Sequence, residues 1–149
     1  MFKRILVPVD GSETSGKALA AAIALAREGA GQLHLVHCVD ELSYMGAYEY
    51  AGAIIDLVRA NGTGILEQAV DTCRAAGIDA VSTFIDTPGQ RLGASVAKLA
   101  VDWKADLVVV GTHGRRGVER VVMGSGAEQI IRMATAPVLV IRGSAAGHG

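Results

Sequence analysis

The chain has 149 residues, of which 50% are hydrophobic, and this predicts one domain with a substantial core. A net charge of −1 provides no electrostatic surface for nucleic acid or for an anionic membrane, so neither partner is expected. No apolar run is long enough to span a membrane and no signal peptide precedes the first strand, so we expect a cytoplasmic protein.

The first predicted element is a buried strand over residues 4–9, which is apolar, β-branched and contains Pro8. Proline cannot donate a backbone hydrogen bond, so Pro8 should lie at the strand's end or at an irregular pairing. Ser12, Thr14 or Ser15 then provides the N-cap of a helix. The apolar face of that helix consists of Leu19, Ala22, Ile23 and Ala26.

Residues 11–18 almost match the phosphate-binding loop Gly-x4-Gly-Lys-Ser/Thr, and they follow a strand as that loop does. The position that should offer a hydroxyl to Mg²⁺ is Ala18, and Glu13 would place negative charge among the phosphates. We therefore interpret the match as coincidental and place Lys17 on a solvent-exposed helical turn.

A second strand is predicted over residues 32–38. It contains His34 and His37, which we interpret as structural because no cluster of His, Cys and carboxylate residues has metal-ligand spacing. Cys38 is interpreted as a small buried hydrophobe. With Cys73 it makes a lone pair of cysteines, which is weak support for a disulfide.

The middle of the chain is less regular. Residues 41–50 hold all three tyrosines, and we interpret them as a helical turn packed on the sheet rather than as a ligand flap or a partner surface. A helical pattern follows over residues 51–76. Gly62 and Gly64 weaken its centre, so the alternatives are one helix, a kinked helix or two helices.

A third strand is predicted over residues 80–85, where the alternation of apolar and polar residues is partial and typical of a sheet edge. Thr87 and Pro88 are the expected N-cap and first residue of the next helix. The apolar face of that helix consists of Leu92, Val96, Leu99, Ala100 and Trp103.

The next stretch begins with a buried parallel strand at residues 107–110 and carries Gly111, Gly114 and Gly124, with Ser125 opening a helical pattern. Glycines let backbone N–H groups approach phosphate oxygens, and a helix start adds unpaired donors and a positive dipole end. Ser125 can cap the helix and can donate its hydroxyl to a phosphate. A single glycine here would serve only a turn, but the whole Gly-x2-Gly-x9-Gly-Ser arrangement predicts nucleotide phosphate binding.

This stretch resembles the ATP-binding signature of the universal stress protein family, which Gly111, Gly114, Gly124 and Ser125 match in spacing. The resemblance covers nearly the whole chain, and it implies that ATP binds with its phosphates on these four residues. It also implies that Asp10 lies near the ribose or a phosphate-bound Mg²⁺. An Asx-type turn that caps the following helix would explain the same residue.

Further site residues follow from the same resemblance. Cys38 and Val39 would meet the adenine through their backbone, and valine commonly stands in the family where this chain has Cys38. Gly126 replaces a small apolar residue and should loosen the helix start, so affinity is expected to be modest. The other expected contacts are Pro8, Val9 and Val110. Arg115 is a candidate because of its charge, which would neutralise phosphate, and its alternative is a solvated surface side chain.

Five strands alternating with about four helices predict an α/β fold, a single doubly wound, Rossmann-like five-stranded parallel sheet in order 3-2-1-4-5 with helices on both faces. The domain should comprise residues 1–142, and residues 143–149 a flexible C-terminal tail. Ligands bind such sheets beyond the strand ends where the order reverses, here between the strands ending at Asp10 and Gly111. Motif and topology therefore predict the same site.

No nucleophile and base have an interpretable spacing, and no lysine falls within the loop, so a catalytic role is uncertain. The first hypothesis is a non-catalytic ATP-binding stress-response or signalling module. The second is a slow ATPase or a phosphoryl-transfer, autophosphorylating enzyme that uses the same site. The third is a dimeric interaction protein with a vestigial nucleotide site.

The fifth predicted strand, residues 136–141, is an apolar run at the sheet edge that Pro137 and Arg142 blunt only at its ends. Antiparallel pairing of residues 137–141 with a second copy would satisfy both edges, as the resemblance also implies. We therefore expect a homodimer. Coverage of the edge by a helix or by the tail would instead leave a monomer.

Overall fold

The computed structural model describes residues 1–39, 51–86, 90–112 and 125–143 of the chain. Five parallel strands form one sheet in the order β3-β2-β1-β4-β5, so the predicted strand order is confirmed. The strands are β1 (Arg4–Pro8), β2 (Gln32–Cys38), β3 (Ala80–Ile85), β4 (Leu107–Gly111) and β5 (Val138–Ile141). The central strand is β1, and β3 and β5 form the two edges.

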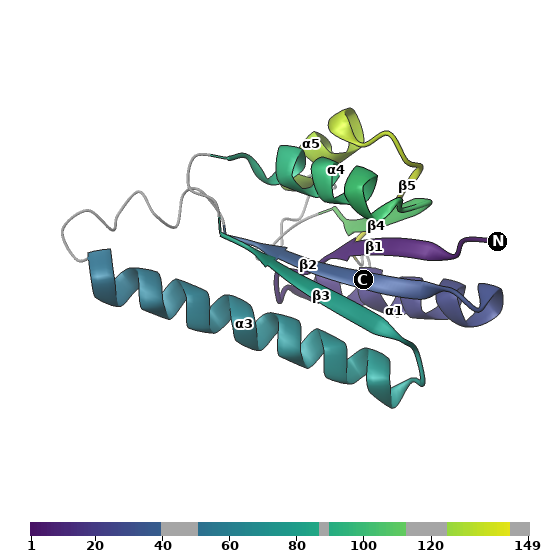
Figure 1. Ribbon diagram of the computed structural model, residues 1–149, viewed down its shortest axis with the longest axis horizontal. Coiled ribbons are helices and arrows are strands. Elements are labelled where there is room, and N and C mark those ends of the chain that lie inside the picture. The colour runs from purple at the N-terminus through teal and green to yellow at the C-terminus, as the bar shows by residue number, and fades with distance from the viewer. Residues whose placement is uncertain (40–50, 87–89, 113–124, 144–149) are drawn as a thin grey trace, which may run out of the picture.

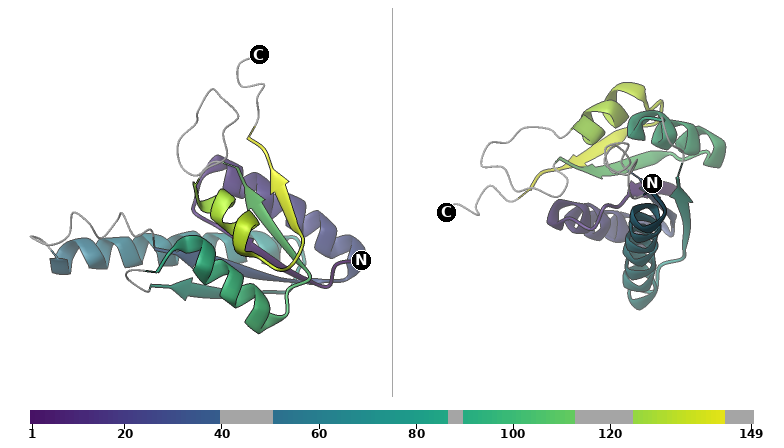
Figure 2. Two further views of the ribbon diagram at one scale, coloured as in Figure 1. Left: turned by 90° about the horizontal axis from the view of Figure 1, so that it is seen from above. Right: turned by 90° about the vertical axis from the view of Figure 1, so that its left-hand side faces the viewer.

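Helices cover both faces of this sheet (Figure 1). Within the described ranges they are α1 (Glu13–Gly29), α3 (Ala51–Ala75), α4 (Leu92–Trp103) and α5 (Ser125–Met133). The α1–α3 layer lies on one face and the α4–α5 layer on the other, as the turned views in Figure 2 also show. Each face of the sheet has its own hydrophobic core. Successive residues of β1 point to opposite faces, so that Ile5 and Val7 belong to the core on the α1 side and Leu6 belongs to the core on the α4 side. The predicted doubly wound α/β fold is therefore confirmed.

Most strand boundaries follow the apolar runs, with three small differences. β1 ends at Pro8, one residue earlier than predicted, and this end position suits a residue that has no N–H to donate. β4 extends one residue further than predicted, to Gly111. The fifth strand begins at Val138 and not at Ala136, and the carbonyl of Pro137 accepts from Val108 N at 2.9 Å. β5 is thus a short edge strand, and Leu139 is its exposed residue.

The α3 helix runs without a break through the Gly62–Gly64 segment, so one continuous helix replaces the alternatives of a kink or two helices. Gly62 is buried and faces the sheet. A Cβ added there would lie 2.4 Å from Phe84 Cε2 and 2.7 Å from His37 Cδ2. Gly64 is exposed, and an added Cβ would meet no atom within 4 Å. Gly62 therefore lets the helix approach the sheet, whereas Gly64 has no such packing role.

The α4 helix begins at Leu92, so the prediction that Pro88 is its first residue was wrong. Thr87 and Pro88 lie outside the described residues, but Arg91 is extended and makes no side-chain cap hydrogen bond. A first-turn donor of α4 is satisfied from α5 instead, since Gly93 N donates to Gln129 Oε1 at 3.0 Å. The helix start is therefore set by packing between α4 and α5, which the local sequence does not encode.

A stacked polar cluster lies between the sheet and the end of α4. His34 is buried, its Nε2 lies 2.7 Å from Thr83 Oγ1, and its ring stands edge-on to Trp103. The Arg4 guanidinium lies 4.2 Å from the centroid of Trp103, and Arg4 Nε donates to Trp103 O. The buried His34 Nδ1 has no hydrogen-bond partner among the described residues. The predicted structural role of His34 agrees with these contacts.

Burial, and secondarily the nearby Arg4 charge, lowers the pKa of His34 below its ordinary value of 6.5. Below pH 6.5 the His34 imidazole of the unfolded chain binds a proton, whereas the imidazole of the folded protein stays neutral until the pH falls further. We therefore expect the free energy of unfolding to decrease as the pH falls through 6.5, and to level off below the folded-state pKa. Urea unfolding between neutral and acidic pH measures the slope. His34→Gln, which keeps a polar group near Thr83, should make it shallower, and an unchanged slope would contradict this assignment.

Candidate functional site

The predicted site lies where the strand order reverses. β1 pairs with β2 on one side and with β4 on the other, with Ile5 opposite Leu33 and Leu107. The crossover from β1 to β2 passes through α1, whereas the crossover from β3 to β4 passes through α4 on the opposite face. The carboxyl ends of β1 and β4 therefore lie side by side with their following segments diverging, as the topology predicted.

The exit of β1 is a tightly bonded turn. Asp10 Oδ1 accepts from Ser12 N at 2.9 Å, and Asp10 N donates to Ser15 Oγ at 3.1 Å. Ser12 is the N-cap of α1, because its Oγ accepts from Ser15 N at 3.1 Å. Gly11 has φ +82°, which favours glycine. The expected Asx-type turn is therefore present, and the Asp10 carboxylate lies at the carboxyl end of the central strand.

The exit of β4 packs against the start of α1. A Cβ added to Gly111 would lie 2.7 Å from Thr14 Cγ2 and 3.0 Å from the Thr14 backbone, so a larger residue does not fit. Val110 and Thr14 are both buried beside it. The close approach of α1 therefore requires a glycine at position 111, the first glycine of the predicted phosphate-binding motif, independently of any ligand.

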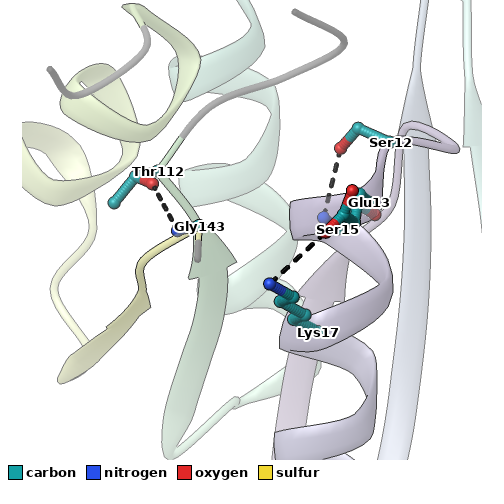
Figure 3. Close-up of polar contacts among 6 residues, drawn as sticks. All are labelled: Ser12, Glu13, Ser15, Lys17, Thr112 and Gly143. Atoms are coloured by element: carbon teal, nitrogen blue, oxygen red, sulfur yellow. Dashed lines mark hydrogen bonds and ion pairs between the residues drawn. The ribbon is translucent and has the colours of Figure 1, made fainter. Parts of the chain in front are cut away.

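Thr112 joins the exits of β4 and β5. Its N–H donates to Ile141 O at 3.0 Å, and its Oγ1 accepts from Gly143 N at 3.3 Å (Figure 3). Thr14 lies on the other side of the same junction, since an added Cβ at Gly143 would be 3.4 Å from Thr14 Oγ1. Sequence reasoning missed both threonines as site neighbours. Thr112 could have been found because it follows Gly111, whereas no local signal indicates Thr14.

Lys17 of the near-match to a phosphate-binding loop lies on a solvent-exposed helical turn, as predicted. Residues 13–17 form the first turn of α1, and Lys17 Nζ lies 3.4 Å from Glu13 Oε1, as Figure 3 shows. Both side chains are substantially exposed, so this is a solvated i,i+4 pair on a helix surface. The Lys17 ammonium therefore forms an ion pair with Glu13 of its own helix.

The end of β2 is the third border of the site. Val39 N donates to Ile85 O at 3.0 Å, so this N–H continues the ladder between β2 and β3. The Cys38 side chain packs against the α4–α5 core, and burial raises the pKa of its thiol to about 12. Both observations agree with Cys38 as a small hydrophobe in the strand.

Part of the predicted motif lies outside the described residues, namely Gly114, Arg115 and Gly124. The helix predicted to start after Gly124 does begin at Ser125. A Cβ added at Gly126 would lie 2.5 Å from Leu92 Cδ2. The glycine that departs from the family pattern is therefore in close contact with α4, and this packing is a reason for it that the sequence does not reveal.

In the described ranges, no group of three His, Cys, Asp or Glu residues is arranged to hold a metal ion, and no helix has the length and apolarity needed to cross a membrane. The sheet is doubly wound, with a hydrogen-bonded Asp-Gly-Ser turn at the end of β1 and a tightly packed glycine at the end of the adjacent strand β4. This is the architecture of a Rossmann-like α/β protein. Residues 1–142 match the model of the universal stress protein family, so the chain belongs to that family.

Two relatives of similar sequence support this family assignment. The chain is 30% identical over 145 residues to "Universal stress protein MJ0531" of Methanocaldococcus jannaschii, covering 95% of this chain and 83% of that one. It is also 30% identical to "Universal stress protein YxiE" of Bacillus subtilis, covering 95% of this chain and all of the relative. The family likeness thus extends over the described sheet and both helical layers.

Solved structures have the same fold. Hypothetical protein MJ0577 superimposes with a TM-score of 0.83 at 24% identity, covering 97% of this chain and 98% of the other. A universal stress protein family member from Burkholderia pseudomallei gives a TM-score of 0.74 at 30% identity, covering 93% and 95%. Similar folds include universal stress proteins in complex with cAMP, with dAMP (Archaeoglobus fulgidus) and with AMP (Arabidopsis thaliana), with TM-scores of 0.66, 0.71 and 0.70 and identities of 24%, 22% and 17%.

Proposed function

We propose that the chain binds an adenine nucleotide, ATP, at the adjacent carboxyl ends of β1 and β4, and that it acts as a non-catalytic stress-response or signalling module. The observation that carries the proposal is the junction of the Asp10 turn with Gly111 at the reversal of strand order. Membership of the universal stress protein family supports it, and so do the AMP, dAMP and cAMP complexes of proteins with this fold.

The phosphates would lie against the glycine-bearing stretch that follows β4. Gly111, Gly114, Gly124 and Ser125 would supply backbone donors and one hydroxyl, and α5 would present the positive end of its dipole. Arg115 would neutralise phosphate charge. Gly126, the next residue of α5, keeps a backbone donor near the helix start.

The base would lie at the end of β2, between the walls formed by Pro8, Val9 and Val110. Because Val39 N already donates to Ile85 O, recognition of adenine by Val39 falls to its carbonyl oxygen, which can accept from the exocyclic amine. The Cys38 backbone would contribute the second contact. This arrangement would favour adenine, which offers a donor at that position, over guanine, which offers an acceptor.

Mg²⁺ would enter the site as an ion bound to the phosphates. With no preformed cluster of metal ligands among the described residues, the protein would contribute the Asp10 carboxylate, and phosphate oxygens and water would complete the coordination. Asp10 lies at the β1 exit, which suits this role, although one of its oxygens already accepts from Ser12 N.

Calorimetric titration with ATP tests the proposal. Gly114→Val should crowd the phosphates, and Ser125→Ala should remove a hydroxyl contact worth about 1–2 kcal/mol, so both variants should bind more weakly than the parent. Titration in Mg²⁺ and again in EDTA tests the ion, which we expect to strengthen binding.

Ser82→Ala is the matched control, because Ser82 is an exposed serine on the edge strand β3. It should leave the affinity unchanged. Parent-like binding by both Gly114→Val and Ser125→Ala would place the site elsewhere. Equal affinities with and without Mg²⁺ would remove only the role assigned to the ion.

The alternative of a slow ATPase or autophosphorylating enzyme uses the same site, so binding alone does not distinguish it. Single-turnover measurements with excess protein do, because a non-catalytic module leaves ATP intact over many hours. Phosphate release, or transfer of phosphate to the chain, would favour the enzyme. Failure of the pure protein to bind any adenine nucleotide would favour the vestigial site.

A cytoplasmic location is proposed as well. Cys38 and Cys73 are both free, and burial raises the pKa of Cys73 to about 11, so neither thiol is activated for disulfide exchange. These properties suit a reducing compartment. Cell fractionation would test the location directly.

We also propose that the protein is a homodimer paired through β5. This strand lies at the sheet edge, and Leu139 exposes 38% of its surface. Ile131 and Met133 of the neighbouring α5 expose 37% and 45% of theirs. Antiparallel pairing of two β5 strands would satisfy both backbone edges and bury apolar surface.

The dimer makes a specific prediction for Leu139→Lys. A lysine on each copy would place two like charges in the paired edge, so the variant should be monomeric or should aggregate. Light scattering at micromolar concentration measures the mass of both proteins. Val101→Lys is the control, because Val101 is exposed on α4, away from the sheet edge. A monomeric parent protein would exclude the dimer.

A further inference from the structure

His37 connects the end of β2 to the exit of β1. Its side chain is 7% exposed, and its Nδ1 lies 2.8 Å from the carbonyl oxygen of Val9. A carbonyl oxygen can only accept, so Nδ1 carries the hydrogen and donates it. The contact therefore fixes both the orientation of the ring and the nitrogen that bears the proton in the neutral form.

The imidazole is held from two further sides. The Phe84 ring lies 5.7 Å from it, centroid to centroid, with the planes tilted by 48°. On the helical side, an added Cβ at Gly62 would lie 2.7 Å from His37 Cδ2 and 3.0 Å from Nε2. The α3 backbone thus lies directly against the ring. His37 is enclosed between α3, β3 and the end of β1, and it has little room to rotate.

Val9 is consequently held at both of its backbone groups. Its N–H donates to Val36 O at 2.8 Å, and its carbonyl accepts from His37. Asp10 follows at once, and its N–H and carboxylate bond to Ser15 and Ser12 in the turn that leads into α1. His37 therefore sets the direction in which the chain leaves β1, one peptide before the Asp10 carboxylate.

We propose that His37 is a positioning residue for the nucleotide site and that it holds the Val9–Asp10 backbone in the binding conformation. This inference rests on the proposed function. His37 would act without touching the ligand, because the Nδ1–H bond orders the β1 exit before ATP arrives. A preordered exit binds more tightly, since the ligand does not have to supply the ordering.

Calorimetry with ATP on a matched set of variants tests this role. His37→Leu replaces the imidazole with an apolar side chain that cannot donate, so affinity should fall about fivefold, which corresponds to the usual net free energy of one hydrogen bond. His37→Asn carries an N–H near the position of Nδ1 and should recover most of that loss. A residue needed only for bulk packing would not be rescued by the smaller asparagine.

His34→Leu is the control, because His34 lies on the same strand, is also 7% exposed and packs on the opposite face of the sheet. It should lower thermal stability yet bind ATP within about twofold of the parent. Parent-like affinity of His37→Leu would overturn the inference and leave the proposed function standing. Absence of ATP binding by the parent would instead refute the proposed function.

Nuclear magnetic resonance of the unmodified protein provides a readout that does not depend on whether the variants fold. With ¹⁵N-labelled histidine, His37 should show a protonated Nδ1 whose proton exchanges slowly with water. Addition of ATP should shift this signal and leave those of His34 in place. A His37 with its proton on Nε2, or one unaffected by saturating ATP, would overturn the proposal.

Discussion

Replacing Gly93 with alanine should lower the free energy of unfolding by about 2–3 kcal/mol, although alanine is the better helix former. The added Cβ would lie 2.3 Å from Gln129 Cβ and 2.9 Å from the Gln129 carbonyl carbon. Because one of these atoms is backbone, rotation of a side chain cannot relieve the clash and the two helices must separate. Separation would also weaken the hydrogen bond from Gly93 N to Gln129 Oε1.

Urea unfolding at neutral pH measures this loss, and Gly16→Ala is its control. Gly16 is an exposed residue of α1, and an added Cβ there would meet no atom within 4 Å. The control should gain about 0.5–1 kcal/mol from helix propensity alone. A stabilised Gly93→Ala would show that α4 and α5 do not pack as closely as described.

The second large effect is expected from a pair of glycines two positions apart in α3. Gly62→Ala should destabilise the protein by about 1–3 kcal/mol, because its Cβ would overlap the rings of Phe84 and His37. Gly64→Ala should stabilise it by about 0.5–1 kcal/mol, since that position is exposed. Thermal unfolding of both variants gives opposite shifts in Tm. Shifts of the same sign would contradict the assigned orientation of α3.

Gly62 and Gly64 show which part of the fold could be predicted from the sequence and which part could not. Both glycines weaken a helical pattern equally, and the pattern alone left open whether the helix continued. The missing information was which face of α3 meets β2 and β3, and therefore that Gly62 admits two rings while Gly64 faces solvent. Such contacts join residues far apart in sequence, and helix propensity does not reveal them.

The strand order was predictable for a different reason. Apolar, β-branched runs alternating with amphipathic helices leave few topologies once crossovers are right-handed. The reversal of strand order in that topology then predicted that the Asp10 turn and Gly111 meet at one site. It did not reveal Thr14 and Thr112 at that junction, because Thr14 approaches Gly111 only when α1 packs under β4.

The central position of β1 has a consequence for synthesis on the ribosome. The first strand emerges early and can pair with β2 along one edge, yet its other edge must wait for β4. The N–H groups of Lys3 and Arg4 both donate to the carboxylate of Asp106, which in the case of Arg4 is 102 positions away. Closing so long a loop is slow compared with local pairing. A nascent chain interrupted before Leu107 therefore lacks one wall of the candidate site.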